Sequence, residues 1–169
     1  GRGNRTNSID SIPLKVTEPR SAAEAIATAL VRHGVKTLFS QSLPSALVLA
    51  AEDAGHEQFT YRTENAGAAM ADGFARLSHQ TTVVTAQNGP AAALLVPSLA
   101  EALKSSVPIV AMVQDVDRPA ADRNAFQELD HIALFQGCAK WVRRITESEC
   151  IEDYVDRAFA AATGGRPGP

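Results

Sequence analysis

"TTVVTAQNGPAAALLVPSLAEALKSSVPIVAMV" (residues 81–113) contains two apolar segments separated by a turn and a helical segment. Its first six residues are rich in β-branched side chains and predict a buried strand. The Gln-Asn-Gly-Pro turn that follows ends in Pro90, which suits the first position of a helix. A second proline, Pro97, predicts a kink or a break within that helix. The last seven residues are apolar throughout and predict another buried strand.

The same alternation extends toward the N-terminus. Helices are expected over residues 22–33, 44–54 and 63–77, and strands over residues 35–39 and 57–61. Short strands that are apolar throughout and alternate with helices are typical of a parallel sheet that is covered on both faces. We therefore predict an α/β fold with three layers, in which helices cover both faces of a mostly parallel sheet.

The alternation ends at residue 113. Residues 114–130 are polar around a single phenylalanine and predict a long loop of the kind that compact domains usually keep for function. Residues 138–145 predict a strand or an extended segment, and residues 148–165 predict a last amphipathic helix. In a parallel α/β domain such a helix returns the chain to the sheet, so we expect the domain to be truncated before its last strand.

Composition narrows the class of protein. The 169 residues carry a net charge of −3 and no basic stripe, which argues against nucleic-acid binding. No apolar run approaches the roughly 18 residues of a membrane span. Residues 1–17 lack the apolar core of a secretory signal and are expected to form a flexible arm before one domain over residues 18–169. Cys138 and Cys150 leave a disulfide open, but they form no CxxC motif, and a reduced cytoplasmic protein is the simpler interpretation.

Standard catalytic motifs are absent from the sequence. It has no GxGxxG, Walker, GxSxG or HExxH motif. The histidines are scattered, and we interpret all four as solvent-facing or helix-capping residues: His33, His56, His79 and His131. The remaining candidates lie where strands end, because ligands of open parallel sheets bind outside the carboxyl ends of the strands.

Two of these strand ends carry the strongest candidates. Glu64 follows the second predicted strand and Asn88 follows the third, so both are expected at one edge of the sheet. Each also has an ordinary explanation, because the helix dipole favours an acid in the first turn and Gln-Asn-Gly-Pro suits a strand–turn–helix connection. Phe126 and Gln127 are equally explained as a hydrophobic tether and its polar neighbour. The residues alone therefore indicate a ligand-binding α/β domain.

Four segments together resemble one family. They follow one another with fitting spacing: RTENAGAAMADGFARL (62–77), residues 85–113, NAFQELDHIALFQGCAKW (124–141) and ATGGRPGP (162–169). They are similar to the N-terminal, pyrimidine-binding domain of thiamine-diphosphate-dependent enzymes of the acetolactate synthase group. The resemblance extends from about Pro19 to Pro169.

The resemblance implies cofactor-binding roles for three residues. Glu64 corresponds to the glutamate that hydrogen-bonds ring nitrogen N1′ of the cofactor's aminopyrimidine, which is both a cofactor-binding and a catalytic role. Asn88 and Gly89 correspond to the turn that lines the pyrimidine pocket. The small residues Ala66 and Gly67 beside Glu64 would let a ring or a partner helix approach closely.

The resemblance also implies a substrate side. Gln127 corresponds to a loop glutamine that faces the substrate and is the second catalytic candidate. Phe126 would pack over the same region. Lys140 matches a lysine that lies near flavin or substrate surfaces in the synthase group. These three residues are the substrate-binding candidates.

The sequence departs from the family pattern at several points. FSQSLPSAL (39–47) stands where a Gly-x-Pro-Gly loop is typical, and QNGPAA (87–92) replaces Ser-Gly-Pro-Gly, which leaves the substrate open. The Gly-Asp-Gly segment that anchors Mg²⁺ and the diphosphate is missing, since ADGF (71–74) lies within a predicted helix. The resemblance therefore implies thiamine diphosphate as cofactor, with Mg²⁺ held by a domain outside this chain and no metal ligand within it. It leaves FAD open.

The function implied is decarboxylation of a small 2-keto acid followed by carboligation, as in branched-chain amino acid biosynthesis. The implied partners are a cofactor-anchoring domain or subunit and further copies in a dimer or tetramer. We expect the helix over residues 63–77 to bury Ala68, Ala69 or Ala71 against another chain or domain. Two alternatives stay open: a small subunit of a two-chain 2-keto-acid decarboxylase, and a non-catalytic ligand-binding domain of the same fold.

Overall fold

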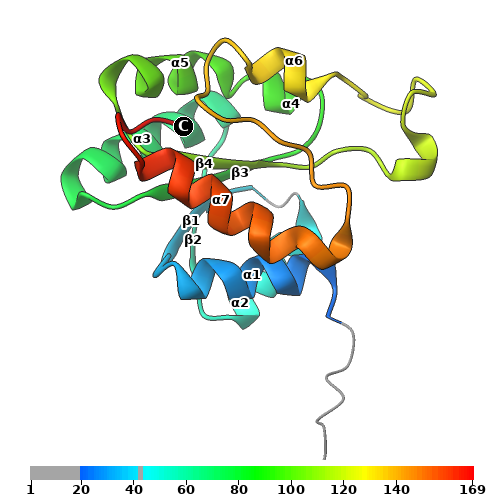
Figure 1. The fold of residues 1–169 in the computed structure, drawn as a ribbon, viewed down its shortest axis with the longest axis horizontal. Coiled ribbons are helices and arrows are strands. Elements are labelled where there is room, and N and C mark those ends of the chain that lie inside the picture. Colours follow the sequence, from blue (N-terminus) through cyan, green and yellow to red (C-terminus); the bar gives the residue numbers. More distant parts are fainter. Residues whose placement is uncertain (1–19, 42–43) are drawn as a thin grey trace, which may run out of the picture.

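A four-stranded parallel sheet forms the centre of the molecule (Figure 1). The computed structural model describes residues 20–41 and 44–169. The strands are β1 (Thr37–Ser40), β2 (Glu57–Thr60), β3 (Thr82–Ala86) and β4 (Ile109–Val113). They lie in the order β2-β1-β3-β4, and every neighbouring pair is parallel. The carboxyl ends of all four strands therefore lie along the same edge of the sheet.

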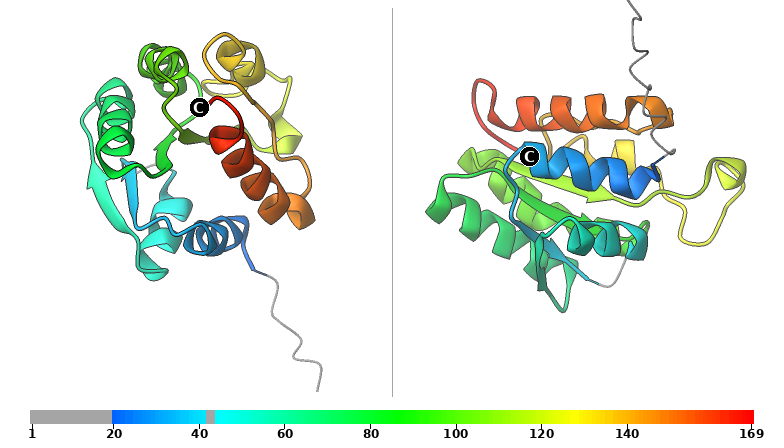
Figure 2. Two further views of the ribbon diagram at one scale, coloured as in Figure 1. Left: turned by 60° about the vertical axis from the view of Figure 1, so that its left-hand side comes forward. Right: turned by 90° about the horizontal axis from the view of Figure 1, so that it is seen from below.

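Helices cover both faces of this sheet (Figures 1 and 2). One face carries α1 (Ala22–Arg32), α2 (Ser45–Asp53) and α7 (Ile151–Thr163). The other face carries α3 (Glu64–Ser78), α4 (Pro90–Ala93), α5 (Val96–Ser105) and α6 (His131–Phe135). Two short 3-10 helices, η1 (Arg118–Ala120) and η2 (Ser148–Cys150), lie in the connections. The predicted three-layer α/β fold is confirmed.

The structure refines several predicted elements. The helix expected after the Gln-Asn-Gly-Pro turn is divided, because α4 ends at Ala93 and α5 begins at Val96, directly before Pro97. The break predicted from that proline is confirmed. Residues 139–147 form neither helix nor strand, so the extended alternative holds for most of the 138–145 segment. Helix α6 was not predicted. The predicted arm at residues 1–17 lies outside the described residues.

Helix α3 packs against the sheet and α5 through small residues. Thr63 caps the helix, since its Oγ1 accepts a hydrogen bond from the Ala66 N–H at 3.3 Å. Ala68 and Ala71 are completely buried within this domain. The expectation that these two alanines pack against another chain or domain is therefore wrong, whereas Ala69 is exposed. Alanines occur on both the buried and the exposed face of this helix, so the sequence alone does not mark which of them point inward.

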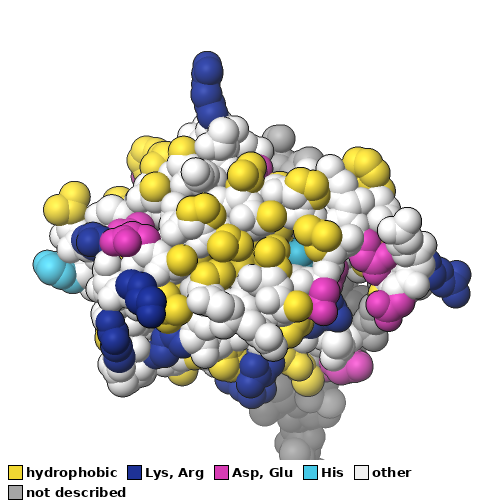
Figure 3. Space-filling model, turned by 90° about the horizontal axis from the view of Figure 1, so that it is seen from above, with side chains coloured by type: hydrophobic (Ala, Val, Ile, Leu, Met, Phe, Trp, Pro, Cys, Tyr) yellow, Lys and Arg dark blue, Asp and Glu magenta, His cyan; other side chains and the backbone are white. Residues whose placement is uncertain are grey.

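The outer surface of the α3–α6 layer keeps several exposed hydrophobic residues. Seen from above, hydrophobic side chains gather across the middle of the molecule (Figure 3). Met70 and Phe74 of α3 are 38% and 40% exposed, and Leu94, between α4 and α5, is 46% exposed. Contiguous apolar surfaces of this kind mark interaction sites on many proteins.

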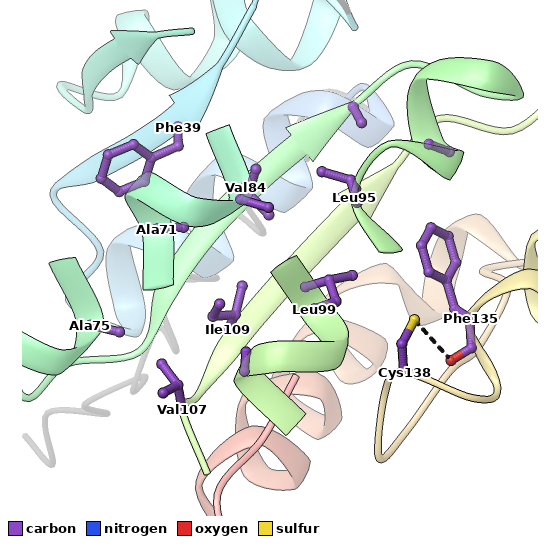
Figure 4. Packing of buried hydrophobic residues seen from close by; sticks show 14 of the residues in the cluster. Phe39, Ala71, Ala75, Val84, Leu95, Leu99, Val107, Ile109, Phe135 and Cys138 are labelled. Carbon is purple, nitrogen blue, oxygen red and sulfur yellow. Dashed lines mark hydrogen bonds between the residues drawn. The ribbon is translucent and has the colours of Figure 1, made fainter. Parts of the chain in front are cut away.

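Two hydrophobic clusters hold the layers together, one on each face of the sheet. The first includes Val84, Leu95 and Phe135 and joins the sheet to α3, α5 and α6 (Figure 4). The second includes Leu30 and Val83 and joins the sheet to α1 and α7. Successive residues of a strand point to opposite faces, so neighbouring valines of β3 serve different clusters. Each such side chain contributes about 1.5–3 kcal/mol by its burial, which makes the sheet a firm support for its edge loops.

Candidate functional site

The candidate site lies at the carboxyl edge of the sheet. The chain leaves β2 through Tyr61 and enters α3 at Glu64, and it leaves β3 through the turn that contains Asn88 and Gly89. Gln41, which follows β1, donates through Nε2 to the Arg62 carbonyl at 2.8 Å. These connections from neighbouring strands are therefore held to one another at the edge where parallel sheets bind ligands.

Glu64 occupies the first residue of α3, directly after the cap Thr63. Its side chain is partly exposed, and within residues 20–41 and 44–169 it has no hydrogen-bond or ion-pair partner. The unpaired N–H groups at the start of a helix favour a negative charge at this position. The carboxylate is thus held by the helix but is left available to accept a hydrogen bond from a ligand.

Tyr61 holds the start of α3, where Glu64 lies, against β3. Its hydroxyl donates to the Thr85 carbonyl at 2.5 Å, and its ring packs on Gly67, where an added Cβ would lie 2.3 Å from a ring carbon. Gly67 thus admits the chain's own tyrosine ring. Burial, together with the nearby negative charge of Glu64, raises the pKa of Tyr61 to about 12. The phenol therefore remains a neutral hydrogen-bond donor at physiological pH.

The β3–α4 turn and the long loop are locked together. The buried Asn88 donates through Nδ2 to the carbonyls of Phe126 at 3.1 Å and Gln127 at 3.3 Å. Gly89 has a φ of +73°, and an added Cβ there would lie 2.3 Å from the Gln127 carbonyl oxygen. Only glycine fits this position without displacing the loop. The structure thus brings Asn88, Gly89 and Gln127 together, although the predicted loop begins far from the turn in sequence.

The long loop has an internal anchor of its own. The Glu128 carboxylate accepts the N–H groups of Asp122 at 2.5 Å and Ala125 at 2.9 Å. The Gln127 backbone has a positive φ of 56° and its side chain is half-buried, whereas the Phe126 side chain is 80% exposed. The loop therefore presents an aromatic ring to the outside, next to residues that are fixed against the β3–α4 turn.

His131 is a residue of this region that the sequence interpretation missed. It is buried, and its Nε2 accepts a hydrogen bond from the Gly89 N–H at 3.0 Å. His56 is also buried, so the interpretation of all four histidines as solvent-facing or capping residues is wrong for these two. A local signal did exist for α6, because Asp130 is a good N-cap and accepts the Ala133 N–H at 3.1 Å.

Lys140 is not brought to this edge. Its Nζ donates to the Gly164 carbonyl at 2.7 Å. Arg166, two residues after Gly164, donates to the Lys104 carbonyl at 2.8 Å. Lys104 lies in the last turn of α5, just before the chain enters β4. Lys140 therefore lies near the amino ends of the strands, at the opposite edge from Glu64.

An apolar groove of about 600 Å³ follows the side of β4 that faces away from β3. It is enclosed by β4, α7 and the extended segment that precedes α7, and its lining includes Ile109, Met112, Val142, Tyr154, Ala158 and Pro169. Gly168 donates its N–H to the Ala162 carbonyl, and the Pro169 carbonyl accepts the Lys140 N–H. The last residues of the chain thus reach one end of the groove.

Residues 20–41 and 44–169 contain neither a metal-binding cluster nor a membrane span. No group of three or more His, Cys, Asp or Glu side chains is placed there to hold a metal ion. None of the helices in that part is both long enough and apolar enough to span a membrane. Cys138 is buried, Cys150 is exposed, and both are free thiols.

Comparison with known proteins places this geometry in a family. Residues 20–134 match the family described as "Thiamine pyrophosphate enzyme, N-terminal TPP binding domain". The chain belongs to this thiamine pyrophosphate enzyme family. The match contains Glu64, the β3–α4 turn and the whole of the loop that carries Gln127. The resemblance to an acetolactate-synthase-type N-terminal domain is confirmed.

Relatives of this TPP-binding domain are several times longer than the chain. It is 38% identical over 151 residues to the "Probable acetolactate synthase large subunit" of Methanocaldococcus jannaschii, covering 87% of this chain and 25% of that protein. It is 35% identical over 153 residues to the "Acetolactate synthase isozyme 2 large subunit" of Escherichia coli K12, covering 88% and 28%. The chain thus spans about a quarter of the length of these curated relatives.

A solved structure supports the same fold. The "thiamine diphosphate-dependent 4-hydroxybenzoylformate decarboxylase" of Rhodococcus jostii RHA1 superposes with a TM-score of 0.81 at 20% identity, covering 89% of this chain and 29% of that one. At this identity the similarity concerns the fold alone. It confirms the α/β architecture of a TPP-enzyme domain.

The carboxyl edge fits the pyrimidine part of the cofactor. A pyrimidine ring nitrogen binds a carboxyl group by sharing a proton with it, and the partly exposed Glu64 side chain has no competing hydrogen-bond partner in the described chain. Tyr61 and Gly67 fix the start of α3 behind that carboxylate.

Proposed function

We propose that this domain supplies the pyrimidine half of a thiamine-diphosphate site in a longer enzyme that acts on 2-keto acids by decarboxylation and carboligation. One observation carries the proposal: Glu64 begins α3 at the carboxyl edge, with an available carboxylate, in a chain of this family. The names of the acetolactate synthase relatives support the substrate class.

In this proposal each residue at the edge has a defined task. The Glu64 carboxylate accepts a hydrogen bond from the pyrimidine ring nitrogen and shares a proton with it. Bound thiamine diphosphate supplies the carbon centre that stabilises negative charge after decarboxylation. Tyr61, which stays neutral, keeps the start of α3 against β3. Asn88 and Gly89 line the pyrimidine side by holding the loop, while Gln127 and Phe126 face the substrate.

Lys140 has no part in this proposal. Its Nζ is bound to the Gly164 carbonyl near the amino ends of the strands, at the opposite edge of the sheet from Glu64.

A second domain or subunit would complete the site. We propose that it holds Mg²⁺ and the diphosphate, and that copies of the enzyme assemble into a dimer or tetramer. The exposed hydrophobic residues Met70, Phe74 and Phe126 support such a contact, since they lie on α3 and on the loop that borders the edge. The free thiols Cys138 and Cys150 support a reduced, cytoplasmic location.

The domain itself would extend beyond residue 169. We propose that a further parallel strand of the same polypeptide fills the groove beside β4, which leaves 18–169 truncated before its last strand. The position of Pro169 at one end of the groove and the open side of β4 support this occupant. A chain that carries its natural continuation should melt at a higher temperature than the 169-residue chain, and Ala158→Arg in the groove should abolish the gain. An unchanged melting temperature would contradict the proposal.

The function is tested by Glu64→Gln in the enzyme that contains this domain. Removing the acid that assists proton transfer should lower turnover of a 2-keto acid at least about 100-fold, with circular dichroism unchanged. Glu52→Gln, at an exposed position of α2, is the matched control and should turn over like wild type. Turnover of Glu64→Gln within threefold of wild type would show that Glu64 is not the acid that assists proton transfer.

A further inference from the structure

We infer that His131 is a positioning residue, which fixes the β3–α4 turn and, through it, the loop that carries Gln127. The inference rests on the proposed function for what Gln127 does there, but its geometric part concerns only this chain. His131 touches neither the Glu64 carboxylate nor the start of α3 in any hydrogen bond. It acts through Gly89 on the β3–α4 turn and on the loop that carries Gln127.

The histidine stands between two strand ends. Its Nε2 accepts the Gly89 N–H at 3.0 Å, and its Nδ1 lies 3.6 Å from Oδ1 of Asp115, which follows the end of β4. Because Nε2 is an acceptor, the ring hydrogen of the neutral imidazole is on Nδ1 and faces that carboxylate. Asp115 is held in turn, since its Oδ2 accepts from Arg144 Nε at 2.7 Å.

The resulting chain of contacts joins three separate segments of the sequence: the turn at Gly89, the end of β4 at Asp115, and the extended segment at Arg144. His131 itself begins α6, four residues after Gln127. The loop is therefore fixed at both sides of Gln127, by the Asn88 amide on its backbone and by the imidazole just beyond it.

The buried imidazole also supplies the hydrogen-bond acceptor that the Gly89 N–H needs. Gly89 is buried, and His131 is the acceptor of its N–H within the described chain. A hydrophobic side chain at 131 would leave this N–H without a partner, and a buried donor without a partner destabilises the conformation that contains it. The turn would then relax away from the Gln127 carbonyl, which packs directly against Gly89.

Two consequences distinguish this positioning role from that of a side chain that only fills space in the core. Loss of the acceptor should impair the loop that carries Gln127 and, through Gly89, one wall of the pyrimidine side, but it should leave Glu64 in place, because the start of α3 is held by Thr63 and the Tyr61–Thr85 hydrogen bond. A side chain that keeps an acceptor near the Nε2 position should restore function. Glutamine meets this condition, whereas leucine fills the space without an acceptor.

The test compares His131→Leu with His131→Gln in the enzyme that contains this domain. We expect kcat/KM for the 2-keto acid to fall at least about 10-fold in the leucine variant and to stay within threefold of wild type in the glutamine variant. The Kd for thiamine diphosphate should rise less than kcat/KM falls in the leucine variant, because Glu64 keeps its support, and should stay near the wild-type value in the glutamine variant. His56→Leu, which removes the other buried imidazole, is the matched control and should keep wild-type kcat/KM. Equal losses in the leucine and glutamine variants, or none in either, would overturn the inference.

A second measurement does not need enzyme activity. In the 169-residue chain labelled with ¹⁵N, an N–H···N hydrogen bond between Gly89 and His131 should give a scalar coupling between the two nitrogens, and the Gly89 amide should exchange slowly with solvent. His131→Leu should speed that exchange at least about 10-fold. Absence of the coupling together with fast exchange in the wild-type chain would refute the inference. Neither result depends on Glu64, so failure of the proposed function would be recognised separately.

Discussion

At the scale of single residues, the negative charge of Glu64 opposes ionisation of the Tyr61 phenol. These two residues lie at the two ends of the short connection between β2 and α3, and burial raises the pKa of Tyr61 to about 12 with a further contribution from the Glu64 charge. The ordinary pKa of the unfolded tyrosine is 10.0. The folded chain therefore holds the phenol proton more tightly than the unfolded chain does. The stability gained is complete below pH 10 and is lost as the pH rises through 12.

A spectrophotometric titration of tyrosinate tests this coupling. One of the two tyrosines should ionise near pH 12 in the wild-type chain, and Tyr61→Phe should remove that step. Glu64→Gln should shift the step to lower pH without returning it to 10, because burial is the larger cause and persists. An unchanged midpoint in Glu64→Gln would show that the carboxylate does not act on the phenol.

At the scale of secondary-structure elements, the site depends on contact between the β3–α4 turn and the long loop. Gly89 contributes through both its left-handed backbone and its missing Cβ, whereas Gly55 has a φ of +90° but open space around it. Both glycines have a positive φ, but only Gly89 also lies against another segment, and its ψ of −128° is unfavourable for any other residue.

Gly89→Ala should lower the free energy of unfolding by well over the roughly 1–2 kcal/mol expected for Gly55→Ala, because a left-handed alanine costs about that much by itself. The excess combines the clash with the Gln127 carbonyl and the strain of an alanine at the φ of 73° and ψ of −128° of Gly89. Urea denaturation of the two variants gives both values. Equal losses of unfolding free energy in the two variants would mean that the loop moves away from the added methyl group at no energetic cost.

Helix α3 offers a second comparison at this scale, between its buried and its outward faces. Ala68→Arg places a charge in the core and should unfold the domain or destabilise it by several kcal/mol. Ala69→Arg, one residue along on the exposed face, should change stability by less than about 0.5 kcal/mol but weaken assembly of the enzyme. Thermal melts and sedimentation velocity measure the two effects. Normal assembly of the Ala69→Arg enzyme would remove this face from the interface.

The same elements show what the sequence could predict. The strands around β3 were predictable because β-branched runs and turn residues are local signals, and the break before Pro97 follows from the missing N–H of proline. The burial of His131 and the contact of Asn88 with the loop arise from packing between distant segments. Glu64 was found through the family resemblance, since an acid in a first helical turn is ordinary on its own.

At the scale of the whole molecule, we propose that the chain holds one part of a larger site. It covers about a quarter of its curated relatives, and the described residues present a carboxylate acceptor without a set of metal ligands. The binding free energy of a diphosphate cofactor depends strongly on its charged end, so the pyrimidine half by itself should bind weakly.

We expect the isolated 169-residue chain to show no decarboxylase or carboligase activity, and to bind thiamine diphosphate with a Kd weaker than about 1 mM in the presence of Mg²⁺. Isothermal titration calorimetry measures the affinity directly. The enzyme that contains the domain serves as positive control. Saturable micromolar binding by the isolated chain would contradict the division of the site proposed above.

The contact between Asn88 and the long loop also has a consequence for the order of folding. Its hydrogen bonds join residues 38 and 39 positions apart, while the ladder between β3 and β4 is held by many contacts over a shorter separation. Closing a long segment costs chain entropy before its few bonds repay it. We therefore expect the β3–β4 ladder to form before the contact between the turn and the loop, so that brief openings of the native chain release the loop while this ladder stays intact.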